Sequence, residues 1–146
     1  MKVLVATDGS IYADAAVKAV ASRLWPADTE IRLMMVLERP AVSYITSGEG
    51  WMQFDNITKD VRTAIKAILD DSVKLVQATG CQISEKIREG DAADEIISEI
   101  EDWGADLVVV GTHGRRGLSR FLLGSVAQRV ATHSPCSVEI VKVHEK

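Results

Sequence analysis

The chain has 146 residues, 47% hydrophobic and 26% charged, so it is long enough to bury the core of one domain and leaves little room for a second. Its net charge of −4 lacks the basic excess that binding to duplex nucleic acid needs, so we expect no nucleic-acid partner. No apolar run approaches the ~20 residues that span a bilayer, and two distant cysteines suit neither a metal site nor a disulfide framework; we therefore expect a cytoplasmic protein with no membrane partner.

The first half of the chain alternates between predicted strands and helices. Residues 3–6 form a short apolar run that suits a buried parallel strand, and Asp8-Gly9-Ser10 breaks this run and supplies helix caps. Residues 31–37 are apolar nearly throughout and predict a second strand, whereas residues 39–56 show no period and predict a long functional or mobile loop. A helix that ends at Trp25-Pro26 is predicted from one apolar face, made of Ile11, Ala15, Ala16, Ala19, Val20 and Leu24.

The second half continues this alternation. Residues 81–88 alternate between apolar and polar side chains, which is typical of an edge strand, and residues 107–110 are wholly apolar, which is typical of a central one. A helix over about residues 122–132 and a strand over residues 137–143 complete the chain. Two further helices are predicted from apolar stripes, one of Ile57, Val61, Ala64, Ile65, Ile68, Leu69 and Val76 before Gly80, the other of Ala93, Ile96, Ile97 and Ile100 before Gly104.

Five strands separated by four helices predict an α/β fold. Strands joined through helices lie parallel, so we expect a single doubly wound domain over residues 1–146, with a five-stranded parallel sheet and helices on both faces. In such open sheets ligands bind beyond the carboxyl ends of the strands. The loops that follow the strands are therefore where a binding site is expected.

The loop after the fourth predicted strand has the composition of a phosphate-binding cradle. It holds Gly111 and Gly114, and Gly124-Ser125 follows at a helix start. Glycines let backbone N–H groups approach an anion closely, and a helix N-terminus adds unpaired donors. Nearby arginines add positive charge: Arg115, Arg116 and Arg120. The P-loop and G-x-G-x-x-G spacings are both absent, and a glycine-rich turn that binds nothing fits the same residues.

This loop carries a resemblance to a known family. Gly111-x-x-Gly114, nine further residues and Gly124-Ser125 form the complete G-x2-G-x9-G-[ST] pattern of the nucleotide-binding universal stress proteins. The segments at residues 108–115 and 122–127 are also similar to that family, as are the opening at 3–10 and the Ser-Pro-Cys-Ser-Val at 134–138. The resemblance covers the whole chain in the same element order.

The resemblance implies the strand order 3-2-1-4-5, which sets the glycine loop opposite Thr7 and Asp8. Asp8 would then meet the ribose and base side of an adenine nucleotide, although a helix cap or Asx-turn also accounts for it. Ala6 and Val36 would flank the adenine with Val110 below it, and plain core packing explains these three equally. The phosphates and ribose would be held by Gly111, Gly114, Arg115, Gly124, Ser125 and Val126, mostly through backbone N–H groups and the Ser125 hydroxyl.

The expected function is that of an ATP-binding signalling or stress-response module, with or without Mg²⁺. His113 lies in the cradle and, with Thr7, is counted among the expected nucleotide-binding residues. No partner for catalysis is identifiable from the sequence, so we assign no catalytic residue and expect at most weak ATP hydrolysis. A slow ATPase or nucleotidyl-transfer enzyme and a nucleotide-free interaction module remain alternatives. The family often has small or acidic residues where this chain has Ile11-Tyr12, so Tyr12 is expected to narrow the ligand mouth.

The fifth predicted strand suggests a homodimer. The family's strand order places this strand at an edge of the sheet, where unpaired N–H and C=O groups are exposed. Its apolar residues are the expected interface: Val138, Ile140, Val141 and Val143. Glu139 and Lys142 have opposite charges, so antiparallel pairing of two copies is expected to bring them together. A strand covered by its own C-terminal tail is the alternative.

Overall fold

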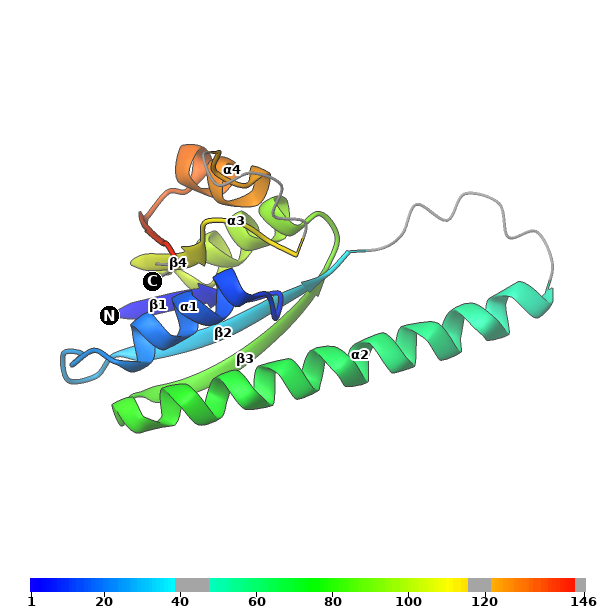
Figure 1. Ribbon diagram of the computed structural model, residues 1–146, viewed down its shortest axis with the longest axis horizontal. Coiled ribbons are helices and arrows are strands. Elements are labelled where there is room, and N and C mark those ends of the chain that lie inside the picture. Colours follow the sequence, from blue (N-terminus) through cyan, green and yellow to red (C-terminus); the bar gives the residue numbers. More distant parts are fainter. Residues whose placement is uncertain (39–47, 116–121, 144–146) are drawn as a thin grey trace.

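The computed structural model describes residues 1–38, 48–115 and 122–143, with residues 48–58 as backbone only. Strands and helices alternate along the chain (Figure 1). In order they are β1 (Lys2–Ala6), α1 (Ile11–Ala21), β2 (Glu30–Leu37), α2 (Gly48–Val76), a 3₁₀ turn (Gln77–Thr79), β3 (Gln82–Glu89), α3 (Ala92–Trp103), β4 (Leu107–Gly111), α4 (Ser125–His133) and β5 (Ser137–Val141).

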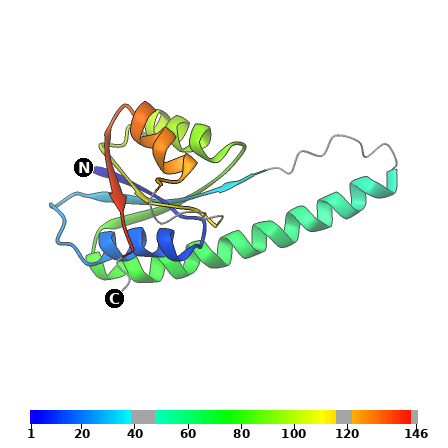
Figure 2. The ribbon, with the colours of Figure 1, turned by 45° about the horizontal axis from the view of Figure 1, so that its top comes forward.

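The strands form one parallel sheet in the order β3-β2-β1-β4-β5, so the predicted fold class and strand order are confirmed. Helices α1 and α2 cover one face of the sheet, and α3 and α4 cover the other (Figure 2). Because side chains alternate along a strand, Val3 and Val5 of β1 pack toward α1 and α2, whereas Leu4 packs toward α3 and α4. Each layer of helices therefore has its own apolar core.

The buried face of α1 differs from the predicted one. The helix buries Ala13, Ala16, Val17 and Val20 and ends at Ala21. Ile11, at the start of the helix, is 65% exposed, and Leu24, beyond its end, is fully exposed. Of the predicted face, Ala16 and Val20 are buried as expected, whereas Ile11 and Leu24 are not. The segment is rich in alanine, which suits either face, so its apolar stripe does not define one orientation.

Helix α2 begins at Gly48, nine residues before the predicted stripe, so residues 48–56 are helical rather than part of a loop. No apolar period marks this stretch, so the signal that predicted the rest of the helix is missing there. The helix packs on the core with its carboxyl half, where Ile65, Leu69 and Val76 are buried, and Val61 is 36% exposed. Its amino end extends past the sheet (Figure 1).

The last two elements are shorter than predicted. Helix α4 begins at Ser125 rather than near residue 122, and β5 ends at Val141, which leaves Val143 outside the strand. Gly111, the last residue of β4, is the ladder partner of Val141. The strand ends there because β4 offers no further partner, which an apolar pattern alone does not reveal.

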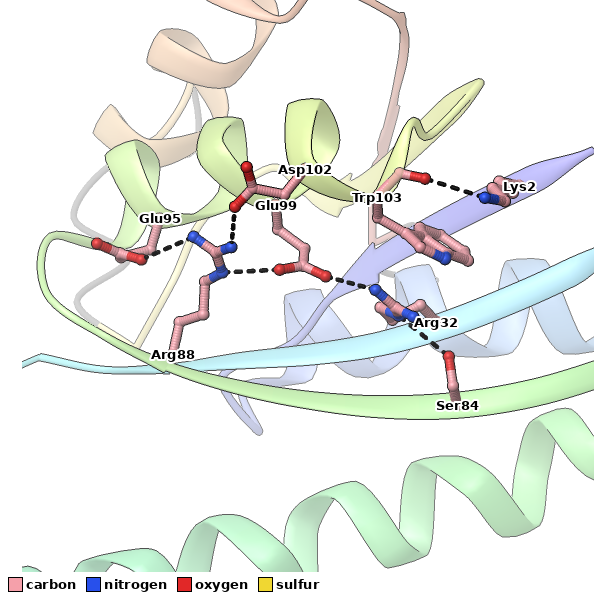
Figure 3. A network of polar contacts seen from close by, with 8 residues as sticks. All are labelled: Lys2, Arg32, Ser84, Arg88, Glu95, Glu99, Asp102 and Trp103. Atoms are coloured by element: carbon pink, nitrogen blue, oxygen red, sulfur yellow. Dashed lines mark hydrogen bonds and ion pairs between the residues drawn. The ribbon is translucent and has the colours of Figure 1, made fainter.

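A network of charged residues lies between the β2–β3 side of the sheet and α3 (Figure 3). Glu99 of α3 is 1% exposed, and its two carboxylate oxygens accept hydrogen bonds from Arg32 of β2 at 2.6 Å and Arg88 of β3 at 2.7 Å. The Arg32 guanidinium also stacks over the Trp103 ring at 4.2 Å. Arg88 further contacts Glu95 and Asp102. The predicted apolar stripe of α3 is confirmed at Ala93, Ile96 and Ile100. Beside it, a buried carboxylate that the stripe did not include joins α3 to two strands.

We expect Glu99→Gln to lower the free energy of unfolding by about 2 kcal/mol, because it leaves two largely buried arginines without their shared anion. Asp102→Asn is the matched control, since Asp102 contacts the same Arg88 but its side chain is 66% exposed; we expect a loss of at most about 0.5 kcal/mol. Urea denaturation of both variants measures the difference. Equal losses would contradict a special role for the buried carboxylate.

Candidate functional site

The candidate site lies at the carboxyl ends of β1 and β4, which are neighbours in the sheet. The chain leaves β1 toward β2 and leaves β4 toward β5, on opposite sides, so the strand order reverses between them. Reversals of this kind open a crevice where α/β proteins bind ligands. Thr7, directly after β1, is buried, and its N–H donates to the Met34 carbonyl of β2 at 2.9 Å. The end of β1 is thereby held in line with the sheet.

Asp8 joins the turn after β1 to the glycine loop after β4. One carboxylate oxygen accepts the Ser10 N–H at 2.9 Å, and the other accepts the Arg115 N–H at 2.9 Å. The side chain of Arg115 also binds Asp8: its Nε–H donates to the Asp8 backbone carbonyl at 2.6 Å. The family resemblance implies that Asp8 lies opposite the glycine loop, and the structure brings the two into direct contact. Asp8 forms the Asx-turn that was its alternative role and contacts the loop as well.

Each glycine of the motif lies where the backbone approaches another group closely. A Cβ atom on Gly111 would lie 2.5 Å from the Tyr12 carbonyl oxygen in the first turn of α1. One on Gly114 would lie 2.9 Å from the Asp8 carboxylate, and one on Gly124 would lie 3.0 Å from the Thr112 carbonyl oxygen. Real Cβ atoms essentially never show contacts under 3.0 Å. Gly111 therefore allows a helix to approach the sheet, while Gly114 and Gly124 shape the loop itself.

Helix α4 points its N-terminus at this loop. Gly124 is the cap residue, and its carbonyl accepts the first intrahelical bond, from Gln128 N–H at 2.9 Å. The N–H groups of Ser125, Val126 and Ala127 thus have no acceptor within the helix. Ser125, the first residue of the helix, is exposed beside the loop. Such an end offers several donors and the positive end of the helix dipole to an anion.

An apolar surface borders these donors. Ala6, Val36 and Val126 are partly buried and pack with the buried Val110 on the side of the sheet that carries α3 and α4. They come from the carboxyl ends of three adjacent strands and from the first turn of α4. The structure thus gathers these four predicted residues beside the glycine loop. A planar apolar group has a surface to pack against there, next to donors for an anion.

His113 lies inside the loop, as predicted, and its ring packs on Tyr12 with centroids 5.0 Å apart. Its two ring nitrogens contact Thr112 Oγ1, at 3.0 Å, and the Leu122 carbonyl oxygen. Tyr12 is therefore held against the loop. That it narrows the mouth of a ligand site stays a prediction. Arg116 and Arg120, predicted to add charge, lie outside the described residues.

The structure gives Glu139 of β5 a charged partner within its own chain. Glu139 binds Arg23 of α1 within the same chain through both carboxylate oxygens, and Lys142 lies outside the strand. The hydrogen bond from Arg23 holds the pKa of Glu139 below its ordinary value, and the same bond raises the pKa of Arg23. Residues 139 and 142 also have opposite parity along a strand, so their side chains would point to opposite faces of a paired sheet. These features argue against the contact expected between Glu139 of one copy and Lys142 of another, and that intermolecular contact stays a prediction.

The described residues contain no group of three or more His, Cys, Asp and Glu side chains arranged to hold a metal ion. Among the same residues, no helix combines the length and the apolar composition of a membrane span.

Comparison with known proteins places these features in a family. The family model described as the universal stress protein family matches residues 1–142. A similar sequence is the universal stress protein MJ0531 of Methanocaldococcus jannaschii, which is 32% identical over 146 residues that cover 99% of this chain and 84% of that protein.

Solved structures give the same result. Protein MJ0577 of the same archaeon, solved as a hypothetical protein to assign its biochemical function, superposes with a TM-score of 0.83 at 28% identity, covering 99% of this chain and 97% of that one. A universal stress protein family protein from Arabidopsis thaliana, solved with AMP bound, superposes with a TM-score of 0.71 at 23% identity, covering 99% and 92%. The second likeness is one of fold.

Proposed function

The chain belongs to the universal stress protein family, and from this premise we propose that it binds ATP, with Mg²⁺, as a cytoplasmic module whose bound nucleotide controls a signalling or stress response. The observation that carries the proposal is the convergence of Asp8, the glycine loop and the N-terminus of α4 at the switch point of the sheet. The bound AMP in a protein of the same fold supports an adenine nucleotide as the ligand.

Each part of the site has a task in this proposal. The N–H groups at the start of α4, with the Ser125 hydroxyl, bind phosphate oxygens, because they lack intrahelical acceptors. Ala6, Val36 and Val110 border the adenine, and Val126 packs beside them. The Asp8 carboxylate holds Arg115 and the loop in place and offers its remaining lone pairs to a ribose hydroxyl. Mg²⁺, if bound, neutralises phosphate charge, with the phosphates as its main ligands.

Isothermal calorimetry of the purified protein tests this proposal. We expect saturable heat with ATP and Mg²⁺, weaker binding of ADP, and weaker binding still of AMP, because each lost phosphate removes acceptors for the α4 N–H groups. GTP is the control for the base, since guanine has the same phosphates. An absence of heat at millimolar ATP would reject the proposal, and equal heats with ATP and GTP would reject adenine recognition.

We expect the isolated protein to hydrolyse ATP slowly, with a turnover number far below the ~1 s⁻¹ at which ordinary enzymes begin. His113, the one imidazole in the described part of the loop, is engaged with Thr112 and Leu122. Release of phosphate is measured at saturating ATP. Turnover near that of ordinary enzymes would favour the ATPase alternative, and loss of this turnover in Asp8→Asn would place it in this site.

We propose in addition that two copies pair through β5. Among the described strands β5 is an edge, with only β4 beside it. The opposite edge, β3, carries two residues that form ion pairs with α2. Glu85 pairs with Lys66, and Glu89 pairs with Arg62. Charges of this kind discourage strand pairing. Apolar β5 is therefore the edge more suited to a second copy.

The ladder identifies which residue of β5 to change. The Thr112 N–H donates to the Val141 carbonyl, and in a parallel ladder the N–H and C=O of one residue face the same neighbour. Val141 therefore faces β4, and Ile140 presents its N–H and C=O outward. We expect Ile140→Pro to give monomers, because it removes an outward donor and spares the β4 ladder. Ile140→Ala, which shortens the side chain and keeps the donor, is the matched control and should stay dimeric in sedimentation velocity. A monomeric wild type at tens of micromolar would contradict the proposal.

A further inference from the structure

The imidazole of His113 bridges the two ends of the glycine loop. Its Nδ1 lies 3.0 Å from Thr112 Oγ1, directly after β4, and its Nε2 contacts the Leu122 carbonyl oxygen, two residues before the cap of α4. A second bond runs parallel to this bridge, from the Gly124 N–H to the Thr112 carbonyl at 2.7 Å. We call these four residues, Thr112, His113, Leu122 and Gly124, the His113 clasp.

Chemistry assigns the proton of this ring. A carbonyl oxygen only accepts hydrogen bonds, so Nε2 must carry the hydrogen that reaches Leu122. In a neutral imidazole Nδ1 is then an acceptor, and the Thr112 hydroxyl donates to it. Thr112 is 7% exposed, so its hydroxyl has little access to water as an alternative partner. The clasp therefore uses both ring nitrogens and leaves neither with a hydrogen aimed at a ligand.

The clasp acts on the part of the loop that would bind phosphate. Gly124 is the cap residue of α4, so the bond from its N–H to Thr112 sets where the helix begins relative to β4. A Cβ on Gly124 would lie 3.1 Å from His113 Cα, which shows how closely the two ends of the loop pack. The Tyr12 ring contacts the imidazole from α1. Histidine is thereby held between α1, the end of β4 and the approach to α4.

We propose that His113 is a positioning residue that holds the N-terminus of α4 in the geometry that binds phosphate, rather than a nucleotide contact or a catalytic base. This inference rests on the proposed function for its ligand. The clasp itself, however, exists in the free protein and can be measured without nucleotide.

The affinity arm compares two substitutions of His113. His113→Phe keeps a ring against Tyr12 and removes both polar atoms, so we expect ATP affinity to fall about fivefold to tenfold. His113→Gln retains an Nε2 hydrogen-bond donor at a similar reach and should stay within about twofold of the wild type. His133→Phe is the control, because His133 lies at the far end of α4. Unchanged affinity in His113→Phe would overturn the proposal, and so would an equal loss in His113→Gln.

The second arm needs no ligand. Amide hydrogen exchange at Gly124, measured by NMR in the free protein, reports the bond to Thr112. We expect faster exchange in His113→Phe, near-normal exchange in His113→Gln, and an imidazole ¹⁵N pattern of the Nε2–H tautomer in the wild type. If ATP affinity falls while Gly124 exchange is unchanged, the imidazole contacts the ligand directly and the clasp is wrong. If neither the wild type nor any variant binds ATP, the proposed function fails. The exchange rate of the Gly124 amide in the free protein then still decides whether the clasp exists.

Discussion

Gly111→Ala is expected to lower the free energy of unfolding by about 3 kcal/mol, the upper end for forcing an extra carbon into a packed region. The added Cβ would lie 2.5 Å from the Tyr12 carbonyl oxygen, 2.6 Å from its carbonyl carbon and 3.0 Å from the Ala13 N atom. All three are backbone atoms in the first turn of α1, so no side-chain rotation relieves the contact. The helix has to move away from β4.

A second glycine separates this effect from the general cost of alanine for glycine. Gly80 has a φ of +71° and nothing within 4 Å of a Cβ, so Gly80→Ala is expected to cost about 1 kcal/mol through backbone strain alone. Thermal unfolding should show a decrease in Tm of roughly 10 °C for Gly111→Ala and a few degrees for Gly80→Ala. Equal shifts would show that α1 and β4 do not need this close approach.

Gly124→Val is expected to lower the affinity for ATP at least ~100-fold, which corresponds to a loss of about 2.8 kcal/mol of binding free energy. The Cβ would lie 3.0 Å from the Thr112 carbonyl oxygen, and the two branches of valine would crowd the cap of α4 where the phosphates are proposed to bind. Gly114→Val acts at the other side of the loop, where its Cβ would lie 2.9 Å from the Asp8 carboxylate. We expect a similar loss there, because Asp8 must shift and release Arg115.

The fold should survive both valine substitutions, with Tm lowered by a few degrees, since neither glycine lies in a strand of the sheet. Thr132→Val is the matched control: it places a valine on the exposed side of the same helix, in its last turn, and should leave ATP affinity unchanged. Calorimetry with ATP and circular dichroism of each variant measure both properties. Normal binding by both glycine variants would place the nucleotide site elsewhere.

Much of the candidate site was predictable because its signal is local. The spacing of Gly111, Gly114 and Gly124 is a property of one short segment. Glycine is common where the backbone approaches another group closely, so these positions predict such approaches from the sequence alone. The contact between Asp8 and Arg115 spans 107 residues and was expected only through the family's strand order. Neither the bridge from His113 to Leu122 nor the ion pair from Arg23 to Glu139 was expected, because both depend on which side chains the fold brings together.

By itself, the sequence determined the order of strands and helices, the parallel sheet and the position of the glycine loop, because apolar runs, caps and glycines act over a few residues. Tertiary structure decided where β5 ends, where α2 and α4 begin and which residues of α1 are buried, whereas Gly104 ends α3 as the sequence predicted. β5 ends at Val141 because β4 ends at its partner Gly111, and the first turn of α1 lies close to β4 because Gly111 has no Cβ to prevent it. Glu99 is buried because arginines from two strands converge on it. In each case the contacts that decide the outcome are made between residues distant in sequence, so a local sequence pattern does not predict them.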